Sequence, residues 1–432
     1  MPNNKESIKS VKKVTKENTL WKDMISGNKR AFGDIKSKIF VAVFSLLLFA
    51  SCQNSLNLFP MPKLSAEKWY SNETQTWFVR FRGYLNVTIE AAKSSRDLNV
   101  FRLQQDYSNL FFHCTKNSKE LIFSILCSLE LKQTLLLISD IITRNSYRFR
   151  EANPTWDLFC TYLFTDGKTI CKSSQYDPLN PFMNRGLRCT ASLVAFGTPQ
   201  FGIISDANLP TLQITRLRRN SKITNEDNRL SAQFGSFNGL IWKKRVVDSL
   251  LLNGRLIEKE DLVIRLLDVM LIYEEVKTEY NEIGESELAA INALRARAIK
   301  VAVPATTFPT IITNVQAELR PEIRIFRRME LASEDLRYIG IIPWEIIGKV
   351  LNRPIYEILN PADLKSKVLD KDFGFLAGIP TIDQEGIPDF MAMAATGLKK
   401  NLVITTCNDL QYLWPIRFSE IQIKTNMKQK EG

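Results

Sequence analysis

Cys52 is the residue whose type and position most clearly predict chemistry. It follows an apolar run, residues 39–50, and an earlier segment, residues 29–38, that holds four Lys or Arg residues. A cationic segment, an apolar run too short to span a bilayer and small residues before a cysteine are typical of a bacterial lipoprotein signal. The sequence therefore predicts that residues 1–51 are a signal peptide and that a lipid on Cys52 anchors the chain to a membrane surface.

The predicted signal differs from the usual pattern in two respects. Phe49 stands three residues before the cysteine, where such signals usually have Leu, and the 51-residue segment exceeds the usual length of about 15–30 residues. A start at Met24 would bring the length into that range. A buried core segment with an incidental cysteine is the alternative, but the charge ahead of the run and its length both favour the signal.

His113 and the remaining cysteines give little indication of catalysis. His113 is the only histidine, which argues against His-rich metal sites and against Ser-His or Cys-His nucleophiles. The remaining cysteines contain no CxxC pair and no zinc-ligand spacing, so we expect mostly buried thiols and predict no cofactor. These cysteines are Cys114, Cys127, Cys160, Cys171, Cys189 and Cys407.

Carboxylate pairs leave a glycoside hydrolase open as the enzymatic alternative. Two acidic side chains suffice for that reaction. The chain offers the pairs Glu274/Glu275 and Asp383/Glu385. Carboxylates in amphipathic helices and turns are usually solvated, however, so these pairs do not by themselves predict an active site.

The composition predicts an ordinary folded chain behind the signal. Apolar residues make up 45% of the 432 residues, aromatic residues 10% and charged residues 24%. These values are close to globular averages and allow a sizeable core in one to three domains. The net charge is +12, but residues 1–51 contain ten Lys or Arg and four Asp or Glu, so half of it leaves with the signal. The rest is spread along the chain without a basic stripe, and we predict no nucleic-acid binding.

The elements that must position any site fall into three segments behind the signal. Residues 52–95 form a tether with two prolines, followed by a helix from Ala66 into the 80s. Residues 96–255 carry many Pro, Gly, Asn and Asp turn signals between short apolar runs, which predicts loops, short helices and a few strands. Residues 256–432 are the most regular part of the chain.

Three helices are expected in this last segment. The first begins at Asp261 and ends at a break, residues 281–285, that contains Gly284, and Ser286 is expected to cap the second. So short a turn requires the two helices to lie antiparallel as a hairpin. The third covers residues 316–336, where Arg and Glu three and four positions apart predict a partly exposed helix with its own salt bridges.

Several motifs resemble the SusD/RagB family of outer-membrane lipoproteins. That family's paired helices are similar to DLVIRLLDVMLIYEEVKTEYNE followed by LAAINALRARA. Its R-x-E-R-R-x-E-L-A-F-E-G-x-R-Y stretch is similar to ELRPEIRIFRRMELASEDLRYIGIIPW, and its closing motif to YLWPIRFSEIQIKTNMKQ. Weaker matches are FTDGKTICKSSQYDPLNPFMNRGLR and LNLFPMPKLSAEKWY. The motifs stand in the family's order behind the predicted lipidated cysteine.

The resemblance implies a mainly α fold, with a tetratricopeptide-like helical scaffold and a loop-rich face that binds glycans. Members of the family sit on the outer membrane as lids over a SusC-like TonB-dependent transporter, to which they pass oligosaccharides or, in some members, peptides. They are not enzymes. By this resemblance we expect a lipid-anchored protein of the outer membrane, at the cell surface, whose partners are a glycan and such a transporter.

Aromatic side chains in and near the loop-rich parts are the candidate glycan contacts. A sugar-binding surface needs flat aromatic faces with polar groups around them. The candidates are Trp77, Tyr147, Trp156, Tyr162 and Trp242. For each of them, packing in the core is the competing role.

The chain also departs from the family's pattern. Only about twenty residues stand between the helix near Trp77 and residue 97, where the family has several long helices, so part of the helical region is missing. Leu267, Glu274 and Val276 replace small alanines, which costs free energy at a close helix contact. Further replacements are Ser333 for Phe, Asp335 for Gly, Gly340 for Asp, Pro343 for Arg, Gly186-Leu187 for Asp-Pro and Arg417 for Pro. A truncated or relict lipoprotein without ligand binding is therefore the second alternative.

Overall fold

The computed structural model describes residues 101–407 and residue 422, apart from several internal gaps. The gaps are 113–117, 129, 132–140, 147–151, 178–179, 208–210, 229, 233–234, 237, 247–260, 300–307, 358–378 and 396–399. The predicted signal peptide, Cys52, the helix expected from Ala66, Trp77, His113, Cys114, Tyr147 and Arg417 lie outside the described residues. The chain divides into two compact units, Met1–Phe101 and Arg102–Gly432, and nearly all the described residues belong to the second.

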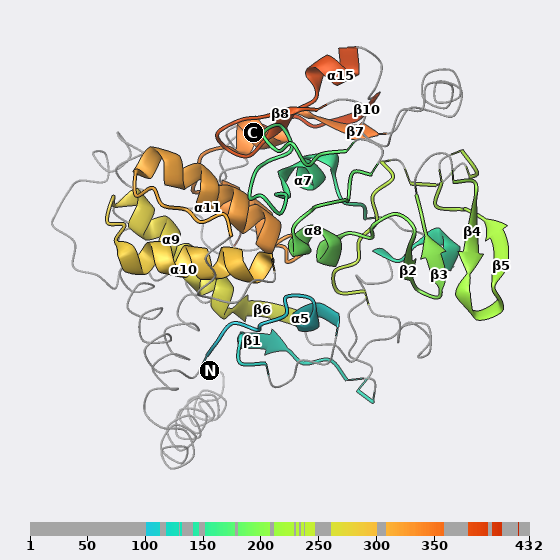
Figure 1. Ribbon diagram of the computed structural model, residues 1–432, viewed down its shortest axis with the longest axis horizontal. Helices are drawn as coiled ribbons and strands as arrows, with labels where there is room; N and C mark the ends of the chain where they lie inside the picture. Colours follow the sequence, from blue (N-terminus) through green and yellow to red (C-terminus); the bar gives the residue numbers. More distant parts are fainter. Residues whose placement is uncertain are drawn as a thin grey trace, which may run out of the picture. The chain divides into compact units, whose positions relative to one another are not determined.

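A two-stranded antiparallel sheet joins the first described residues to the middle of the chain. β1 (Leu121–Ile125) pairs with β6 (Asp261–Arg265), and α5 (Asn109–Phe112) lies beside them in Figure 1. The helix predicted from Asp261 therefore begins five residues later than expected. The β-branched residues Val263 and Ile264 suit a strand, and pairing with β1 outweighs the helical spacing of the apolar residues.

The helical hairpin predicted after this strand is confirmed. α9 (Leu266–Glu279) and α10 (Glu285–Ala298) are joined by residues 280–284, and the Tyr273 hydroxyl donates to the Glu287 carboxylate at 2.9 Å. The expected cap was wrong. Gly284 is the N-cap of α10, and its backbone N–H donates to Glu287 at 3.0 Å, while Ser286 lies within the first turn.

α11 (Gln316–Glu330) packs against α9 and ends six residues earlier than the sequence predicts. Ser333 and Asp335, which follow it, have φ values of 62° and 61°. This left-handed backbone is incompatible with a continuing α-helix, so the chain turns at this point. The same turn sets residues 331–336 against the cavity described below.

The charges of α11 bind other elements instead of one another, so the prediction of internal salt bridges was wrong. Arg320 pairs with Glu279 of α9 at 2.7 Å, and Arg327 pairs with Asp268 of α9 at 2.9 Å. Glu330 and Glu334 lie in the core, where they bind cations from distant parts of the chain. Spacing along one helix reveals that charges can pair, but tertiary partners decide which pairs form.

The described residues between 102 and 246 form loops, short helices and strands, as the turn signals predict. Besides α5, their helical pieces are η3 (Arg144–Ser146), α7 (Trp156–Thr161), α8 (Leu187–Ser192) and η4 (Leu217–Arg219). A four-stranded antiparallel sheet contains β2 (Thr198–Gln200), β3 (Ile203–Ser205), β4 (Gln213–Arg216) and β5 (Ser221–Thr224), in that order. The N-terminus of α7 is capped by the Thr155 hydroxyl, which accepts from the N–H of Leu158 at 3.2 Å.

The described C-terminal part is built from short elements packed beside α7 and α11 (Figure 1). Its helices are α12 (Arg337–Ile341), α13 (Ile347–Leu351) and α15 (Met391–Ala395). β7 (Pro354–Glu357) pairs with β10 (Lys400–Ile404), and β8 (Thr381–Ile382) pairs with β9 (Pro388–Asp389), both antiparallel. The described residues thus contain nine α-helices and ten strands, so the expectation of a mainly α fold is only partly confirmed.

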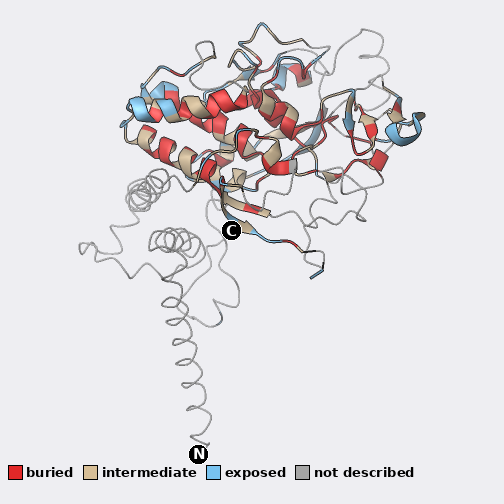
Figure 2. Cartoon of the chain, turned by 60° about the horizontal axis from the view of Figure 1, so that its bottom comes forward, coloured by how far each residue is buried: buried red, intermediate tan, exposed pale blue. Residues whose placement is uncertain are grey.

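One hydrophobic core joins the two sequence segments 96–255 and 256–432. Trp156 and Phe159 of α7 pack in the same cluster as Leu267 of α9, Phe326 of α11 and Phe390. Figure 2 shows buried residues along the long helices and in the loops beside them. The loop-rich segment is therefore held by a core that the helical segment shares.

Candidate functional site

A cavity of about 370 Å³ lies beside the C-terminal end of α11. Its walls come from the start of α7, the end of α11, the turn 331–336, α12, α13 and β7. The volume falls within the range of about 300–1,000 Å³ that small-molecule sites occupy. A second cavity, lined by Tyr162 among others, measures about 30 Å³ and has room only for water.

Two tryptophans contribute to the wall of the larger cavity, hereafter the α11 cavity. Trp242 is half-buried, and its backbone forms an antiparallel bridge with Leu193. Trp344 donates from its indole N–H to the Glu275 carboxylate, and the Arg337 guanidinium lies 5.8 Å from its ring centroid. Trp242 is thus held by its backbone and Trp344 by its indole N–H, and both residues border the cavity.

Arginines outnumber carboxylates in the wall of the α11 cavity. The charged lining residues are Arg327, Arg328, Arg337 and Arg353 together with Asp157 and Asp335. Burial raises the pKa of Asp157, although Arg328 and Arg353 oppose this effect. Burial, with the neighbouring charge of Arg328, lowers the pKa of Arg337 to about 9. Arg337 is therefore charged near neutral pH, and guanidinium groups predominate over carboxylates in the wall.

The aromatic residues that the sequence proposes as glycan contacts occupy different environments. Trp156 and Tyr162 are each 1% exposed and lie in the hydrophobic core, where their faces meet other core side chains. Trp242 is the one that borders the α11 cavity. Trp77 and Tyr147 lie outside the described residues.

The carboxylate pairs considered for hydrolysis are both engaged in other contacts. Glu274 is 1% exposed within α9, and Glu275 accepts the indole N–H of Trp344. Asp383 accepts the backbone N–H of Glu385 at 2.8 Å and so closes a turn, while Glu385 pairs with Arg324. The first pair thus supports helix packing, and the second supports the β8–β9 connection.

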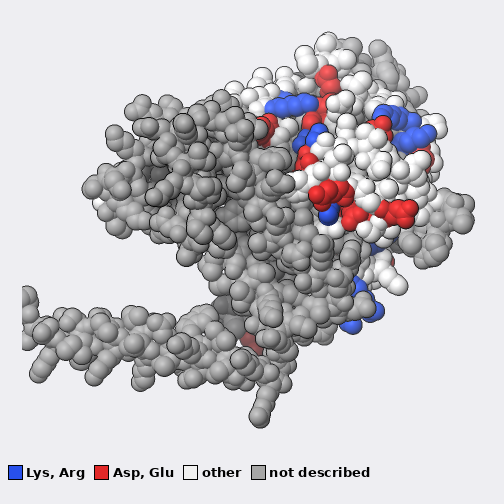
Figure 3. Space-filling view, turned by 90° about the vertical axis from the view of Figure 1, so that its left-hand side faces the viewer, with Lys and Arg blue, Asp and Glu red and all other residues white. Residues whose placement is uncertain are grey.

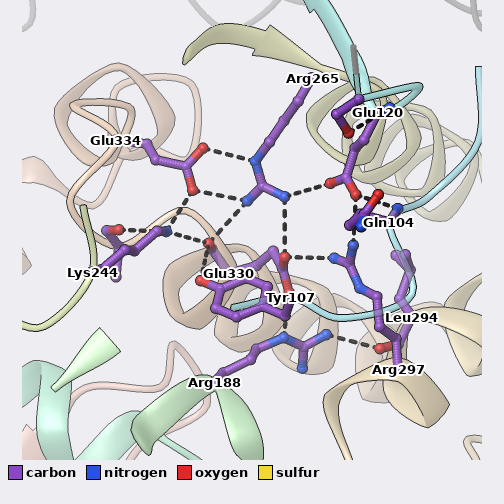
Figure 4. A network of polar contacts seen from close by, with 12 residues as sticks. Gln104, Tyr107, Glu120, Arg188, Lys244, Arg265, Leu294, Arg297, Glu330 and Glu334 are labelled. Atoms are coloured by element: carbon purple, nitrogen blue, oxygen red, sulfur yellow. Dashed lines mark hydrogen bonds and ion pairs between the residues drawn. The ribbon is translucent and has the colours of Figure 1, made fainter. Parts of the chain in front are cut away.

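A second concentration of charge lies entirely inside the molecule (Figure 4). Its cations are Arg188, Lys244, Arg265 and Arg297, and its anions are Glu120, Glu330 and Glu334. Arg265 stands at the centre and bonds Glu120 at 2.9 Å, Glu330 at 3.1 Å and Glu334 at 2.7 Å. Each cation in the cluster has a carboxylate partner, so we interpret it as a structural network that ties together segments far apart in the sequence.

The cluster keeps the Glu330 and Glu334 carboxylates ionised despite their burial, because neighbouring cations lower the pKa of both. Burial alone would raise the pKa of Glu330, but Arg188, Arg297 and Arg265 outweigh it and hold that pKa well below its usual range. Burial lowers the pKa of Lys244 to about 8, although Glu334 opposes the shift. Glu330 and Glu334 were expected on a partly exposed, salt-bridged helix, whereas both lie in the core.

The remaining candidate chemistry is limited in the described part of the chain. Cys127, Cys160, Cys171, Cys189 and Cys407 are in the thiol form there, and three of the five are buried, as predicted. Within the described ranges, no group of His, Cys, Asp or Glu side chains could hold a metal ion. No helix among these residues is long and apolar enough to cross a membrane.

Basic and acidic side chains are interspersed on the face shown in Figure 3. Partly exposed ion pairs such as Lys277–Glu282 at 2.8 Å and Arg320–Glu279 at 2.7 Å fit this arrangement. This face therefore presents no broad field of one sign of the kind that nucleic-acid binding uses.

Comparison with known proteins identifies relatives of this fold. The model of the SusD family matches residues 137–432. A solved SusD-like carbohydrate binding protein from Bacteroides fragilis is similar at 23% identity and a TM-score of 0.61, over 80% of this chain and 61% of that protein. Another SusD-like protein from Bacteroides fragilis is 18% identical, with a TM-score of 0.55 over 86% of this chain and 67% of that one. No curated protein matches. The chain thus spans about three fifths of the length of the first of these relatives.

Proposed function

This chain belongs to the SusD family, and we propose that it is a glycan-binding lipoprotein of the outer membrane. In this proposal it captures oligosaccharides outside the cell and delivers them to a SusC-like TonB-dependent transporter. The α11 cavity is the site at which capture takes place. A SusD-like relative described as a carbohydrate binding protein supports this choice of ligand class.

The α11 cavity is the observation that carries the proposal. It combines the size of a small-molecule site with two tryptophan side chains and a ring of polar groups. Indole faces pack on the C–H faces of sugars, while guanidinium and carboxylate groups bond their hydroxyls. Trp242 is the proposed stacking residue, and Asp157 with the arginines supplies the polar contacts.

Binding without hydrolysis is part of the proposal. Asp157 is a half-buried carboxylate of the cavity, and it lies 3.8 Å from a guanidinium nitrogen of Arg353. Glycoside hydrolysis needs two carboxyl groups placed on either side of the scissile bond. The second lining carboxylate, Asp335, is exposed and sits on the turn after α11. We therefore assign the cavity to recognition.

The test is thermal unfolding of the full chain, purified in detergent, with a panel of neutral and acidic oligosaccharides. A ligand that binds only the folded state raises the unfolding midpoint. We expect at least one oligosaccharide class to do so, and we expect Trp242→Ala to lose the shift while Trp242→Phe, which keeps an aromatic face, retains most of it. A cooperative transition that no oligosaccharide moves would contradict the proposal and favour the relict alternative.

The membrane anchor is proposed from the sequence and has its own test. Cys52→Ala removes the proposed lipidation site, so the variant should leave the outer-membrane fraction that holds the unaltered chain. Cys407→Ala serves as the matched control because it removes a thiol elsewhere in the chain. Retention of Cys52→Ala in the membrane fraction would refute lipid anchoring at this residue.

A further inference from the structure

We propose that the α11 cavity recognises the negatively charged group of an acidic saccharide, a carboxylate or a sulfate ester, through Arg327, Arg337 and Arg353. This inference rests on the proposed function and narrows it to a class of substrate. It follows from the charge of the cavity wall, from the hydrogen-bonding capacity that the arginines leave unused and from the space beside them.

Arginines outnumber aspartates among the residues that line the cavity. The wall holds four arginines and two aspartates, and Asp335 is on the exposed side of the turn. Arg327 pairs with Asp268 outside the lining, and the half-buried Asp157 lies 3.8 Å from Arg353, beyond hydrogen-bonding distance. A guanidinium group that is partly withdrawn from water gains from an anionic partner. An anionic ligand would supply such a partner to the arginines that lack a close carboxylate.

Three of these guanidinium groups leave a buried nitrogen without a hydrogen bond in the described part of the chain. The atoms are Nη1 of Arg327, Nη2 of Arg337 and Nη1 of Arg353. Two of the three groups use another nitrogen for a contact within the chain. Nη2 of Arg327 forms an ion pair with Asp268 at 2.9 Å, and Nη2 of Arg353 donates to the carbonyl of Pro388. The engaged nitrogens fix the orientation of these two groups. The unused N–H groups therefore stand ready for a ligand oxygen.

Arg337 is the strongest of the three contacts. No carboxylate of the described residues lies within ion-pairing distance of its guanidinium, whose neighbours include the Trp344 ring at 5.8 Å. Arg328, in contrast, donates to the carbonyl of Gly386 at 3.0 Å. A planar guanidinium presents two parallel N–H groups that match the two oxygens of a carboxylate or sulfate. Arg337 is thus placed to bind such a group in a bidentate manner.

Gly340 leaves room beside these arginines. A Cβ atom added at Gly340 would lie 3.7 Å from Nε of Arg327, which is ordinary van der Waals contact. An aspartate at this position would bring a carboxylate of the chain to the arginines without a steric clash. In its absence, the ligand supplies that charge. Gly340→Asp is therefore a variant that should fill the anion site from within.

The cavity also offers a contact for a sugar ring, so we propose a charged saccharide as the ligand instead of a free anion. Trp242 borders the same cavity and offers an apolar face for the ring, while the arginines hold its charged substituent. The combined site would distinguish an acidic sugar from its uncharged counterpart, because the latter leaves the buried N–H groups unpaired.

Calorimetric titration of the full chain in detergent tests this inference with matched ligands. The first pair is trigalacturonate and its methyl ester, the second a galactose trisaccharide with and without 6-sulfate, and sodium sulfate at equal ionic strength is the free-anion probe. We expect one charged trisaccharide to bind at least tenfold more tightly than its uncharged partner. Arg337→Gln should remove that preference, whereas Arg320→Gln, outside the cavity, should leave the preference intact.

Gly340→Asp gives an independent readout, because it should abolish the preference while the unfolding midpoint stays equal or rises. Equal affinities within both ligand pairs, or a preference that survives Arg337→Gln, would overturn the inference and leave the proposed function standing. Binding of sulfate alone, with none of the trisaccharides and none of the wider oligosaccharide panel bound, would instead overturn the saccharide proposal. It would also reduce the cavity to a simple anion site, which contradicts the inference as stated.

Discussion

Asp335 shows how a single residue shapes the cavity wall. Its φ of 61° lies in the left-handed region, where an L-residue costs about 1–2 kcal/mol. Replacing Asp335 by glycine would relieve this strain. Glycine is also more flexible in the unfolded chain, which takes back about 0.5–1 kcal/mol of the stability gained. We predict that Asp335→Gly raises the free energy of unfolding by up to about 1 kcal/mol.

The control for this prediction is Asp335→Ala, which removes the same carboxylate but keeps a Cβ atom at positive φ. Urea denaturation of both variants separates backbone strain from charge. If Asp335→Ala stabilised the chain as much as Asp335→Gly, the effect would come from the carboxylate and the argument from strain would be refuted.

The pKa of Arg337 determines how we expect ligand affinity to change with pH. The groups that influence it are Arg328, Arg324, Asp157 and Glu385, and its pKa in the unliganded cavity is about 9. A bound anion favours the charged form and raises this pKa, so binding takes up protons where the free group has lost them. Affinity for a sulfated trisaccharide should therefore be constant from pH 6 to 8 and fall above about pH 9.

Calorimetry across this pH range measures the effect, because the sulfate ester itself does not titrate there. The variant Arg337→Lys provides a control with a different intrinsic pKa. An affinity that stays constant up to pH 10.5 would mean that no arginine with a lowered pKa takes part in binding.

The residue-level site could be predicted from the sequence only in part. Trp242 was selected as an aromatic in a loop-rich segment, and it does border the cavity. Trp156 was selected on the same grounds and lies in the core, because composition does not reveal on which side of a short helix a residue packs. Arg327 and Arg328 were interpreted as charges of a partly exposed, salt-bridged helix, since their spacing matches ordinary ion pairs, and Arg337 and Arg353 were not selected.

At the scale of elements, the turn between β8 and β9 is held tightly against α11. Gly386 has a φ of 71°, and a Cβ atom added there would lie 2.5 Å from Cγ1 of Ile325. Its carbonyl also accepts a hydrogen bond from Arg328 at 3.0 Å. We predict that Gly386→Ala lowers the free energy of unfolding through two effects, backbone strain and a clash of the added methyl group with Ile325. The clash alone should contribute about 1–3 kcal/mol.

Gly197 provides the matched control for this contact. Its φ is 70°, but an added Cβ atom would meet nothing within 4 Å. Gly197→Ala should therefore show only the cost of a left-handed backbone, about 1–2 kcal/mol. Denaturant titration of the two variants gives the difference directly. Equal losses would show that the β8–β9 turn does not press on α11.

The existence and order of the long helices could be predicted, but their ends could not. Apolar spacing gives α9, α10 and α11 because each buries one face against a shared core. The first five residues expected in α9 form β6 instead, since β1 offers strand pairing. β1 begins at Leu121 and β6 at Asp261, 140 residues later in the chain. Local periodicity contains no information about such a distant partner.

At the scale of the whole molecule, the buried charge cluster joins the parts of the chain. Glu330, at the end of α11, forms ion pairs with Arg297 at 2.6 Å, with Arg265 at 3.1 Å and with Arg188. Neutralising this carboxylate leaves three cations buried without their shared partner. We predict that Glu330→Gln lowers the free energy of unfolding by about 3–5 kcal/mol.

Glu322→Gln is the control, because Glu322 pairs with Arg295 at 3.2 Å while its side chain is 40% exposed. Loss of such a surface pair costs less than about 1 kcal/mol. The comparison is made by chemical denaturation at pH 7. A small loss for Glu330→Gln would mean that the cluster does not bind the segments together, and the account of the fold would need revision.

A crystal structure of the full chain with the charged trisaccharide that binds best tests the site and its chemistry together. We expect the sugar in the α11 cavity, its ring against Trp242 and its anionic group within hydrogen-bonding distance of Arg337. An empty cavity with the sugar bound elsewhere on the chain would contradict both the site and its proposed chemistry.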